Sequence, residues 1–385
     1  MVTMQTAYTT EIDEIDDAMN EILGQLDMTA LRKNSVGIVT CHFDFVEAGL
    51  IAELSARLPF DVIGMTTMAS GNEHGFDMYG LSLAVLTSDD VVFETAITAP
   101  FGTGDYKEKL AETYAETRSK LQEDPSLIIS FFPYLRDISG AVLVKYFDEL
   151  CGGVPTWGSL STNTDISYDH CRSIRNDVAE RDALVMLLLR GPVDPEFVVV
   201  SIPEQKIRAN RGVITESDDC VLKKVNNLPV LEYFKTMGVE LLPNAANATP
   251  IMVYYEDNTE PVALGIFTIR EDGSFLCGGE MTEGASISIG EITAEGILAT
   301  ARDGVRHILQ SGRHNGALML PCVTRYVMLA PDQKSEIRLV SRLMGENASL
   351  PYMMGYSGGE VCPVRDETGK THNRFHNYTF SACVF

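Results

Sequence analysis

One pattern occurs three times in this sequence and restricts the fold more than any other feature. An apolar run of strand length is followed by a segment with helical periodicity, then by a proline and a short apolar run that stops at glycine. The first strands of the three copies are expected at 35–41, 126–132 and 316–322, and the second strands end at Gly64, Gly158 and Gly355. A connection of this length is typical of two parallel strands joined by a helix.

Further apolar runs follow each copy of the pattern. They lie at 80–87 and 91–98, at 183–189 and 197–202, and at 378–385. We therefore predict an α/β fold of repeated strand–helix–strand units with added antiparallel strands. A chain of 385 residues is longer than one core usually supports, so two domains are expected.

The domain limits follow from the same periodicity. Apolar residues at helical spacing over 12–26 predict a helix, and we assign 1–34 to an N-terminal helical extension. The first domain is expected to span 35–230 and the second 231–385, with the boundary region between about 225 and 250.

Net charge and apolar runs exclude several classes of partner. The formal net charge of −24, from 54 acidic and 30 basic residues, repels nucleic acid and anionic lipid. The first residues have no basic segment followed by an apolar one, and the longest apolar run, 183–189, is too short to span a bilayer. We expect a cytoplasmic protein without membrane insertion. The eight cysteines are scattered without a CxxC pair and indicate reduced core thiols.

Polar loops rich in small residues begin at the ends of the second strands. Thr66 and Thr67 belong to the first of these loops, and Gly355, Ser357 and Gly359 belong to the last. Ligands of open α/β sheets bind at the carboxyl ends of strands, so these loops are candidate walls of a site. The alternative is that each glycine merely ends its strand.

The last loop also matches the G-x-S-x-G pattern of serine hydrolases. Ser357 is followed in order by Asp366 and His376, as the triad of such an enzyme would be. The two glycines and Pro363 after Ser357 are poor material for the helix that this motif needs. A serine hydrolase using Ser357 is therefore kept only as an alternative, and we expect no enzyme.

Other charged or metal-binding candidates carry a structural alternative. Arg270 and Arg325 lie in or beside apolar runs, where each needs a partner, either a ligand carboxylate or a structural Glu or Asp. His372 and His376 are four residues apart, but in an extended segment that spacing, roughly 13 Å, is too long for one metal ion. We predict a hairpin turn around Gly369 and no metal site.

Several segments resemble one bacterial family of sensory proteins, the FIST family (F-box and intracellular signal transduction). They are GYSGGEV (355–361), FHNYTF (375–380), DVIGMTT (61–67), VPTWGSLS (154–161) and the bridge at 213–238. The resemblance covers nearly the whole chain from about residue 35. It implies a FIST N-like domain over 35–230 and a FIST C-like domain over 231–385.

The resemblance implies sensing rather than catalysis. It implies a small-molecule ligand, such as an amino acid or a similar metabolite, and signalling in trans to a histidine kinase, a cyclic-dinucleotide enzyme or a chemoreceptor. Some members of the family bind haem and sense nitric oxide, so a haem-binding sensor is an alternative, with His42, His74 or His376 as axial ligand. A homo-oligomer is compatible with these expectations.

The residues of the last loop agree with a binding site. Glu360 offers a charge for an ammonium group, His376 and Asn377 offer donors and acceptors, and Thr66 and Thr67 close the site from the first domain. The alternative is that Glu360 and Asn377 fix the last hairpin to its loop.

Overall fold

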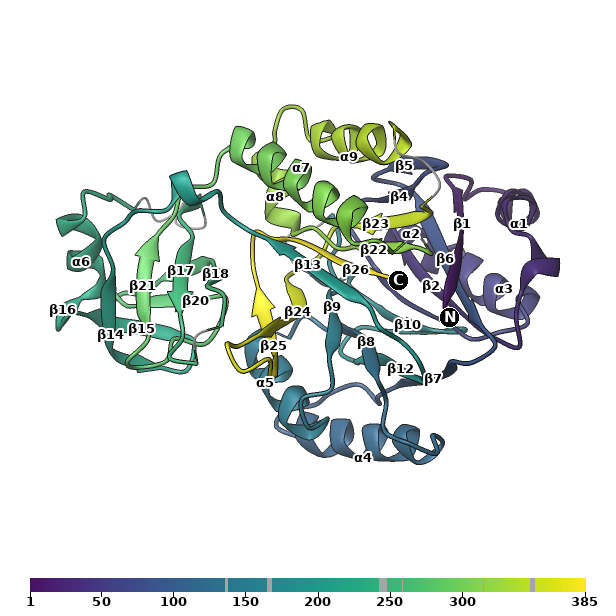
Figure 1. Ribbon diagram of the computed structural model, residues 1–385, viewed down its shortest axis with the longest axis horizontal. Coiled ribbons are helices and arrows are strands. Elements are labelled where there is room, and N and C mark those ends of the chain that lie inside the picture. Colours follow the sequence, from purple (N-terminus) through teal and green to yellow (C-terminus); the bar gives the residue numbers. More distant parts are fainter. Residues whose placement is uncertain (136–137, 165–167, 242–247, 258, 314, 347–349) are drawn as a thin grey trace.

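Three six-stranded sheets form the body of the protein, and a smaller β-domain projects from it (Figure 1). The computed structural model describes residues 1–385 except 136–137, 165–167, 242–247, 258, 314 and 347–349. The expected boundary region therefore lies partly outside the described residues. The α/β architecture with added antiparallel strands is the predicted one.

The first sheet contains the first predicted parallel pair and three helices on its outer face. In spatial order its strands are β1 (Thr3–Thr9), β6 (Leu81–Ser88), β2 (Asn34–Cys41), β3 (Val62–Thr66), β10 (Ser173–Arg175) and β11 (Val178–Glu180). The helices are α1 (Ile15–Gln25), α2 (Phe43–Glu47) and α3 (Leu50–Arg57), with the 3-10 turn η1 (Met28–Ala30) after α1. The N-terminal segment thus contains strand β1 as well as the expected helix. The helix expected after β2 is divided at Gly49, whose φ of 80° ends α2.

The second sheet has the same plan. Its strands are β7 (Val92–Ile97), β12 (Val185–Arg190), β8 (Leu127–Phe132), β9 (Thr156–Leu160), β24 (Glu360–Arg365) and β25 (Thr371–His376). Helices α4 (Tyr106–Ser119) and α5 (Gly140–Leu150) cover its outer face. The predicted hairpin is the β24–β25 pair, and Gly369 in its turn has a φ of 85°.

The third sheet repeats the plan with strands from both ends of the chain. Its strands are β13 (Glu196–Val200), β26 (Phe380–Val384), β22 (Ala317–Met319), β23 (Tyr352–Gly355), β4 (Ser70–Asn72) and β5 (Gly75–Asp77). Its helices are α7 (Ala294–Gln310), α8 (Val323–Met328) and α9 (Ser335–Glu346).

Each sheet is completed by a hairpin that leaves another unit. The pairs β2–β3, β8–β9 and β22–β23 are parallel, as the sequence pattern predicts. The hairpin β4–β5 follows β3 but pairs with β23, β10–β11 pairs with β3, and β24–β25 pairs with β9. The three units are therefore linked in a cycle. Two of its three links, from β4–β5 to β23 and from β24–β25 to β9, cross the expected boundary at 230.

The glycines of two second strands have a packing reason. A Cβ on Gly64 would lie 1.9 Å from the carbonyl oxygen of Val39, and one on Gly158 would lie 1.8 Å from that of Ser130. Both clashes are with backbone of the parallel partner strand, so no larger residue fits. The glycine that ends each of these two strands in the sequence thus marks close backbone contact.

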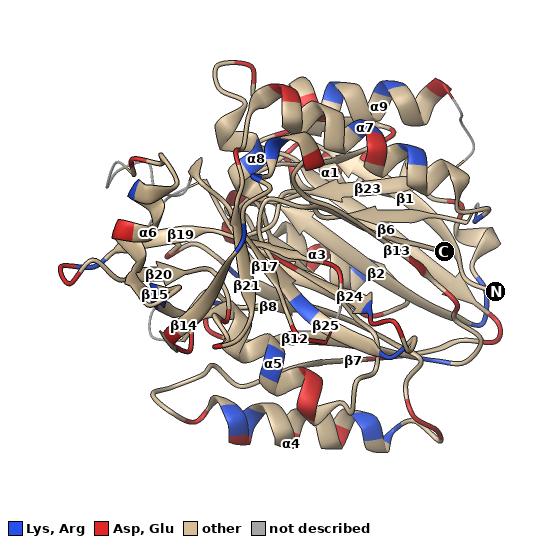
Figure 2. Cartoon of the chain, turned by 60° about the vertical axis from the view of Figure 1, so that its left-hand side comes forward, with Lys and Arg blue, Asp and Glu red and all other residues tan. Residues whose placement is uncertain are grey.

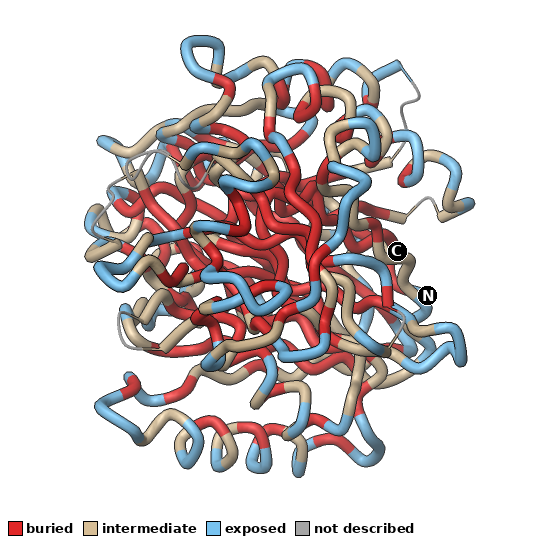
Figure 3. Tube along the Cα trace, turned by 90° about the vertical axis from the view of Figure 1, so that its left-hand side faces the viewer, coloured by how far each residue is buried: buried red, intermediate tan, exposed pale blue. Residues whose placement is uncertain are grey.

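The inner faces of the three sheets share one core. Residues of all three parallel pairs meet there, including Ile38, Trp157 and Met353, and the buried part of the chain is continuous across the sheets (Figure 3). Trp157 is fully buried and its indole Nε1 donates to the hydroxyl of Ser381 at 2.9 Å. The eight cysteines are buried. Charged residues occur mainly on the outer helices and loops (Figure 2).

The projecting β-domain is inserted between β13 and α7, and we call residues 212–289 the inserted domain. Its elements are β14 (Gly212–Asp218), β15 (Val221–Val225), β16 (Leu228–Pro229), α6 (Val230–Thr236), β17 (Ile251–Tyr254), β18 (Val262–Leu264), β19 (Ile266–Ile269), β20 (Phe275–Cys277) and β21 (Ser286–Ile289). The 3-10 turn η2 (Glu204–Lys206) precedes it. It has its own core around Phe234 and Phe275. Over the described residues, every helix is too short or too polar to cross a membrane.

Candidate functional site

A cavity of about 550 Å³ lies between the inserted domain and the body, and we call it the interdomain cavity. Phe267, Thr268, Arg270, Leu276, Cys277 and Gly278 line it from the inserted domain. The body contributes residues that follow β8 and β22, the first strands of two parallel pairs, and Gly358, which follows β23. The cavity therefore lies at the carboxyl ends of strands, where the sequence pattern predicts a site.

Two of the candidate residues, Arg270 and Asn377, line this cavity. Arg270 is exposed, and its side chain makes no hydrogen bond or ion pair among the described residues, although its charge helps to lower the pKa of Asp272. Gly358, between the candidates Ser357 and Gly359, lines it as well. Because the guanidinium of Arg270 has no partner among the described residues, Arg270 is the candidate best placed to bind a ligand.

Asn377 connects the body to the inserted domain. Its Oδ1 accepts from the backbone N–H of Gly265 at 3.0 Å, and its own N–H donates to the carbonyl of Ala263 at 2.9 Å. Its Nδ2 donates to the carbonyl of His376 at 3.0 Å. Asn377 therefore uses its polar groups within the protein, and its side chain forms part of the rear wall of the cavity.

Ser357 and Glu360 form a buried cluster beside the cavity. Both are fully buried; the Ser357 hydroxyl donates to Glu360, and the Thr379 hydroxyl donates to the other carboxylate oxygen at 2.6 Å. Cys322, which lines the cavity, also hydrogen-bonds Glu360. Burial raises the pKa of the Glu360 carboxyl to about 7, against the opposing effect of these hydrogen bonds. Glu360 itself faces none of the cavities described here, and its role in ligand binding stays a prediction.

Thr66, Thr67, Gly355 and Gly359 lie where the loops of different units meet. The Thr66 hydroxyl accepts from the N–H of Arg172 at 2.8 Å, and the Thr67 hydroxyl donates to the carbonyl of Tyr356. A Cβ on Gly355 would lie 3.0 Å from the Thr40 side chain, and one on Gly359 would lie 2.3 Å from the ring of Phe375. These four residues hold the loops together.

Arg325 is buried in the third unit. Its Nη2 lies 2.5 Å from the Glu336 carboxylate, and its other donors reach Thr300 and the carbonyls of Ile297 and Tyr378. Tyr356 donates to the second oxygen of Glu336 at 3.0 Å. The arginine thus has a structural carboxylate as partner, the alternative that the sequence left open.

His376 lines a second cavity, of about 410 Å³. It is 2% exposed, and neither ring nitrogen makes a hydrogen bond of ordinary geometry within the described part of the chain. Burial lowers the pKa of its imidazole to about 4, with the Cys362 backbone acting weakly in the opposite direction. The ring is therefore neutral at pH 7. Arg211, Glu204 and Glu260 are the charged side chains that line this cavity.

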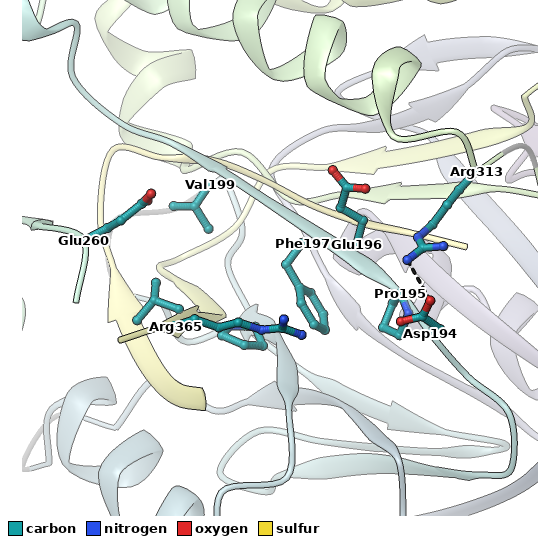
Figure 4. Close-up of a pocket in the computed structure, with 10 residues that line it drawn as sticks. Asp194, Pro195, Glu196, Phe197, Val199, Glu260, Arg313 and Arg365 are labelled. Atoms are coloured by element: carbon teal, nitrogen blue, oxygen red, sulfur yellow. Dashed lines mark hydrogen bonds and ion pairs between the residues drawn. The ribbon is translucent and has the colours of Figure 1, made fainter. Parts of the chain in front are cut away.

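A third cavity, of about 430 Å³, continues along strand β13 (Figure 4). It shares Val199, Glu260 and Val364 with the cavity of His376, so the two form one groove between β13 and β24. Arg313 reaches Asp194 there at 3.0 Å. We call it the β13 groove.

Sequence reasoning missed most of the cavity wall. Tyr134 follows β8 and stacks on Tyr168 with ring centroids 3.9 Å apart, and Phe267 is 55% exposed at the edge of the cavity. A loop after a first strand is a signal that could have found Tyr134. Within the described ranges, no three His, Cys, Asp or Glu residues are grouped as metal ligands would be.

The arrangement of the chain matches two domain families in tandem. The FIST N domain matches residues 35–227, and the FIST C domain matches residues 229–363. The chain belongs to the FIST family. FIST domains are sensory domains of signal transduction. The FIST C match starts inside the inserted domain, at residue 229, and ends in strand β24.

Other comparisons add little to the family assignment. No curated protein matches the chain. Two similar solved structures are cyanuric acid hydrolases: one is 9% identical, with a TM-score of 0.28 over 76% of this chain and 100% of the other. The second, from A. caulinodans, is 10% identical, with a TM-score of 0.28 over 100% of this chain and 98% of the other. Likeness at this level carries no argument about the FIST chain described here.

Proposed function

We propose that this FIST protein is a sensor that binds a small metabolite in the interdomain cavity and signals in trans through another protein. The observation that carries the proposal is the origin of the cavity wall, which comes from both the inserted domain and the body. A ligand in this position contacts both parts at once. It can therefore favour one arrangement of the two parts over another, which is what a sensor requires.

The contacts between the inserted domain and the body around the cavity are largely polar, so a bound ligand can change how the two parts pack. Besides Asn377, Lys145 of α5 reaches Glu280 at 2.8 Å, and Arg374 of β25 pairs with Asp257. Exposed or half-exposed ion pairs of this kind contribute little to stability. A ligand that adds contacts between the two parts is thus able to change the balance. An amino acid or a similar metabolite is the ligand class that the family suggests, and a histidine kinase, a cyclic-dinucleotide enzyme or a chemoreceptor is the proposed output partner.

The state of Ser357 favours binding over hydrolysis. Its hydroxyl is fully buried and already donates to Glu360, so a substrate carbonyl has no path to it. The Asp366 carboxylate accepts from the ring of His372 at 3.0 Å, whereas the His376 ring is bonded to neither Asp366 nor Ser357. The three residues in triad order therefore form no hydrogen-bonded chain, which such catalysis needs.

Haem is the second candidate ligand, and the observation that favours it is the free imidazole of His376. His42 uses both ring nitrogens, one toward the N–H of Asp44 and one toward Thr164. The carboxylates of Glu204 and Glu260 that face the cavity of His376 do not suit an apolar porphyrin. His376 could thus serve as an axial ligand, but the charged wall around it does not fit the porphyrin ring. The proposed function therefore does not depend on haem. A Soret band in protein purified after haem supply, lost in His376→Ala, would revive this candidate.

A thermal-shift screen of amino acids and related metabolites tests the proposal. A ligand that binds the native state raises the unfolding midpoint by mass action. We expect Thr268→Trp, which places a large ring in the cavity from an exposed strand position, to abolish the shift. Val213→Trp, at another exposed strand position of the inserted domain, is the control and should keep it. A ligand whose shift survives Thr268→Trp binds elsewhere and contradicts the proposed site.

A further inference from the structure

We infer that the ligand of the interdomain cavity is an aromatic carboxylate that carries no ammonium group. The inference rests on the proposed function, since it names the ligand class of the same cavity. It comes from three features of the wall: the charge of its lining residues, the aromatic rings that face it and the hydrogen-bond donors around Arg270.

The charge of the wall is opposite to that of the protein. The chain carries 54 acidic residues and a net charge of −24, yet among the described lining residues there is no Asp or Glu. Arg270 is the one charged side chain in that part of the wall. Because its guanidinium is without an ion pair there, a ligand anion is its natural partner. A planar carboxylate matches the two parallel N–H groups of a guanidinium.

The same wall argues against an amino acid as the ligand. An α-ammonium group that leaves water needs a carboxylate or several acceptors to replace its hydration. Glu360, the acid that sequence analysis offered for this purpose, is enclosed by Ser357, Thr379 and Cys322 and does not line the cavity. Glu280 lines a different cavity, where it pairs with Lys145. An ammonium group in the interdomain cavity would thus be left without a counter-charge from the described wall.

Aromatic side chains form much of the remaining wall. Tyr134 and Tyr168 stack at 3.9 Å with an interplanar angle of 12°, and Phe375 and Tyr378 line the cavity from β25 and the residues after it. Phe267 leaves 55% of its surface exposed at the edge, which is unusual for a phenylalanine and would be covered by a ligand ring. Rings bind each other through stacked or edge contacts, so a flat apolar body suits these surfaces.

The hydroxyl groups of the wall are neutral. Thr268 stands two residues before Arg270 on the same wall, and Thr324 lies on the body side, whereas the Ser139 hydroxyl already bonds the N–H of Val142 and the thiol of Cys220. One cation and a few hydroxyls can balance a single negative charge, whereas a phosphate dianion would need a second cation or a set of backbone amides. The volume of about 550 Å³ is within the ordinary range of small-molecule pockets and accepts a ligand with a single ring or a fused pair.

A matched series of one-ring compounds tests the inference by isothermal titration calorimetry on the full chain. 3-Phenylpropionate carries the acid alone, phenylalanine adds the ammonium group, phenethylamine carries the amine alone, and 3-cyclohexylpropionate replaces the aromatic ring. We expect 3-phenylpropionate to bind most tightly. Arg270→Gln should weaken it roughly ten- to hundredfold, the usual effect of losing a charge-assisted hydrogen bond, and Phe267→Ala should weaken it less.

Arg365→Gln is the matched control, because Arg365 is also exposed but lies in the β13 groove. It should leave the affinity unchanged. Equal binding of 3-phenylpropionate by wild type and Arg270→Gln would overturn the inference, as would an absence of binding. Tighter binding of phenylalanine or phenethylamine that Thr268→Trp abolishes would overturn the ligand class while keeping the cavity as the sensor site. Failure of every metabolite to bind in a Thr268→Trp-sensitive way would instead remove the proposed function itself.

Discussion

The third unit of the body differs from the first two at the junction between sheets. In the first two exchanged hairpins the third residue bonds the edge strand of a neighbouring sheet. Asn72 donates to the carbonyl of Ala7 in β1 at 2.8 Å, and Arg175 donates to Thr95 in β7 at 2.8 Å and pairs with Asp61. The corresponding residue of β24 is Cys362, whose thiol lies near Ser381 instead. The β13 groove lies at this third junction.

The third unit is also the one with buried charge. Among the described residues, the buried Arg and Glu side chains are Arg325, Glu336 and Glu360, and all three belong to it. At the first position of the exchanged hairpins, Glu360 stands where the other two have Ser70 and Ser173. The first two units thus show that this arrangement of strands and helices needs neither buried charged side chains nor a groove at the junction between sheets.

The largest expected effect is that of Arg325→Ala. Removal of the guanidinium leaves Glu336 buried without its ion pair, which costs about 3–5 kcal/mol of unfolding free energy. Chemical denaturation measures this loss. Arg338→Ala is the control, since Arg338 lies on helix α9 with Glu336 but pairs with Asp332 at the surface, and its loss should change stability little. Equal losses in the two variants would mean that the third unit does not depend on its buried charges.

A smaller effect is expected where the junctions themselves are changed. Asn72→Ala removes buried hydrogen bonds to Ala7, Ser82 and the N–H of His74, and should cost about 1–3 kcal/mol. Cys362→Ala removes one small buried thiol, which lies near Ser381, and should cost about 1 kcal/mol. Thermal unfolding compares the two. A greater loss of stability for Cys362→Ala than for Asn72→Ala would contradict the view that the third junction is held together less tightly than the first.

The smallest expected effect is the pH dependence of the wild-type protein between about pH 4.5 and 6.5. Glu360 and His376 are paired across β24 and β25, and their pKa values are shifted in opposite senses. The raised pKa of Glu360 gives stability that is complete below its unfolded pKa and is lost as pH rises toward 7. The lowered pKa of His376 gives stability that is complete above its unfolded pKa and is lost as pH falls toward 4. In the shared window the two slopes offset each other.

Single variants of this pair should expose the opposing slopes. Relative to wild type, Glu360→Gln should gain stability as pH rises through the window, because only the histidine contribution is left. His376→Gln should lose stability over the same rise. Urea denaturation at several pH values measures both differences. Parallel profiles for wild type and the two variants would show that neither group is titrating as described.

The sequence allowed the repeated units to be predicted because their signals are local. Each parallel pair needs an apolar run, a helical segment and a close backbone contact, and Gly64 and Gly158 record that contact directly. The turn at Gly369 is equally local. The exchange of hairpins between units was not predictable, since pairing such as that of Asn72 with Met353 joins segments that are far apart in the chain.

The candidate site was predictable only in part, for the same reason. A lone arginine in an apolar segment signals a need for a partner, but the sequence does not say which. Arg325 pairs with Glu336 within the fold, whereas Arg270 lines the interdomain cavity and has no carboxylate partner among the described residues. Glu360 follows the glycine loop as expected, yet its position in the exchanged hairpin turns the carboxyl inward toward Thr379. The partner that a side chain contacts depends on the neighbouring unit, and a local sequence pattern contains no information about that unit.

The exchange of hairpins also determines the order in which the sheets can be completed during synthesis. The first sheet lacks two strands until residues 173–180 have left the ribosome, and the second lacks two until residues 360–376 have done so. Until then strand β9 has an open edge, which is a template for unwanted pairing with other chains. The nascent chain must therefore keep β9 from pairing wrongly over some 200 residues of elongation. Helix α5 is made just before β9, and the inserted domain is made during that interval. Both α5 and strand β18 of the inserted domain lie beside β25, the outer strand of the hairpin that closes this edge.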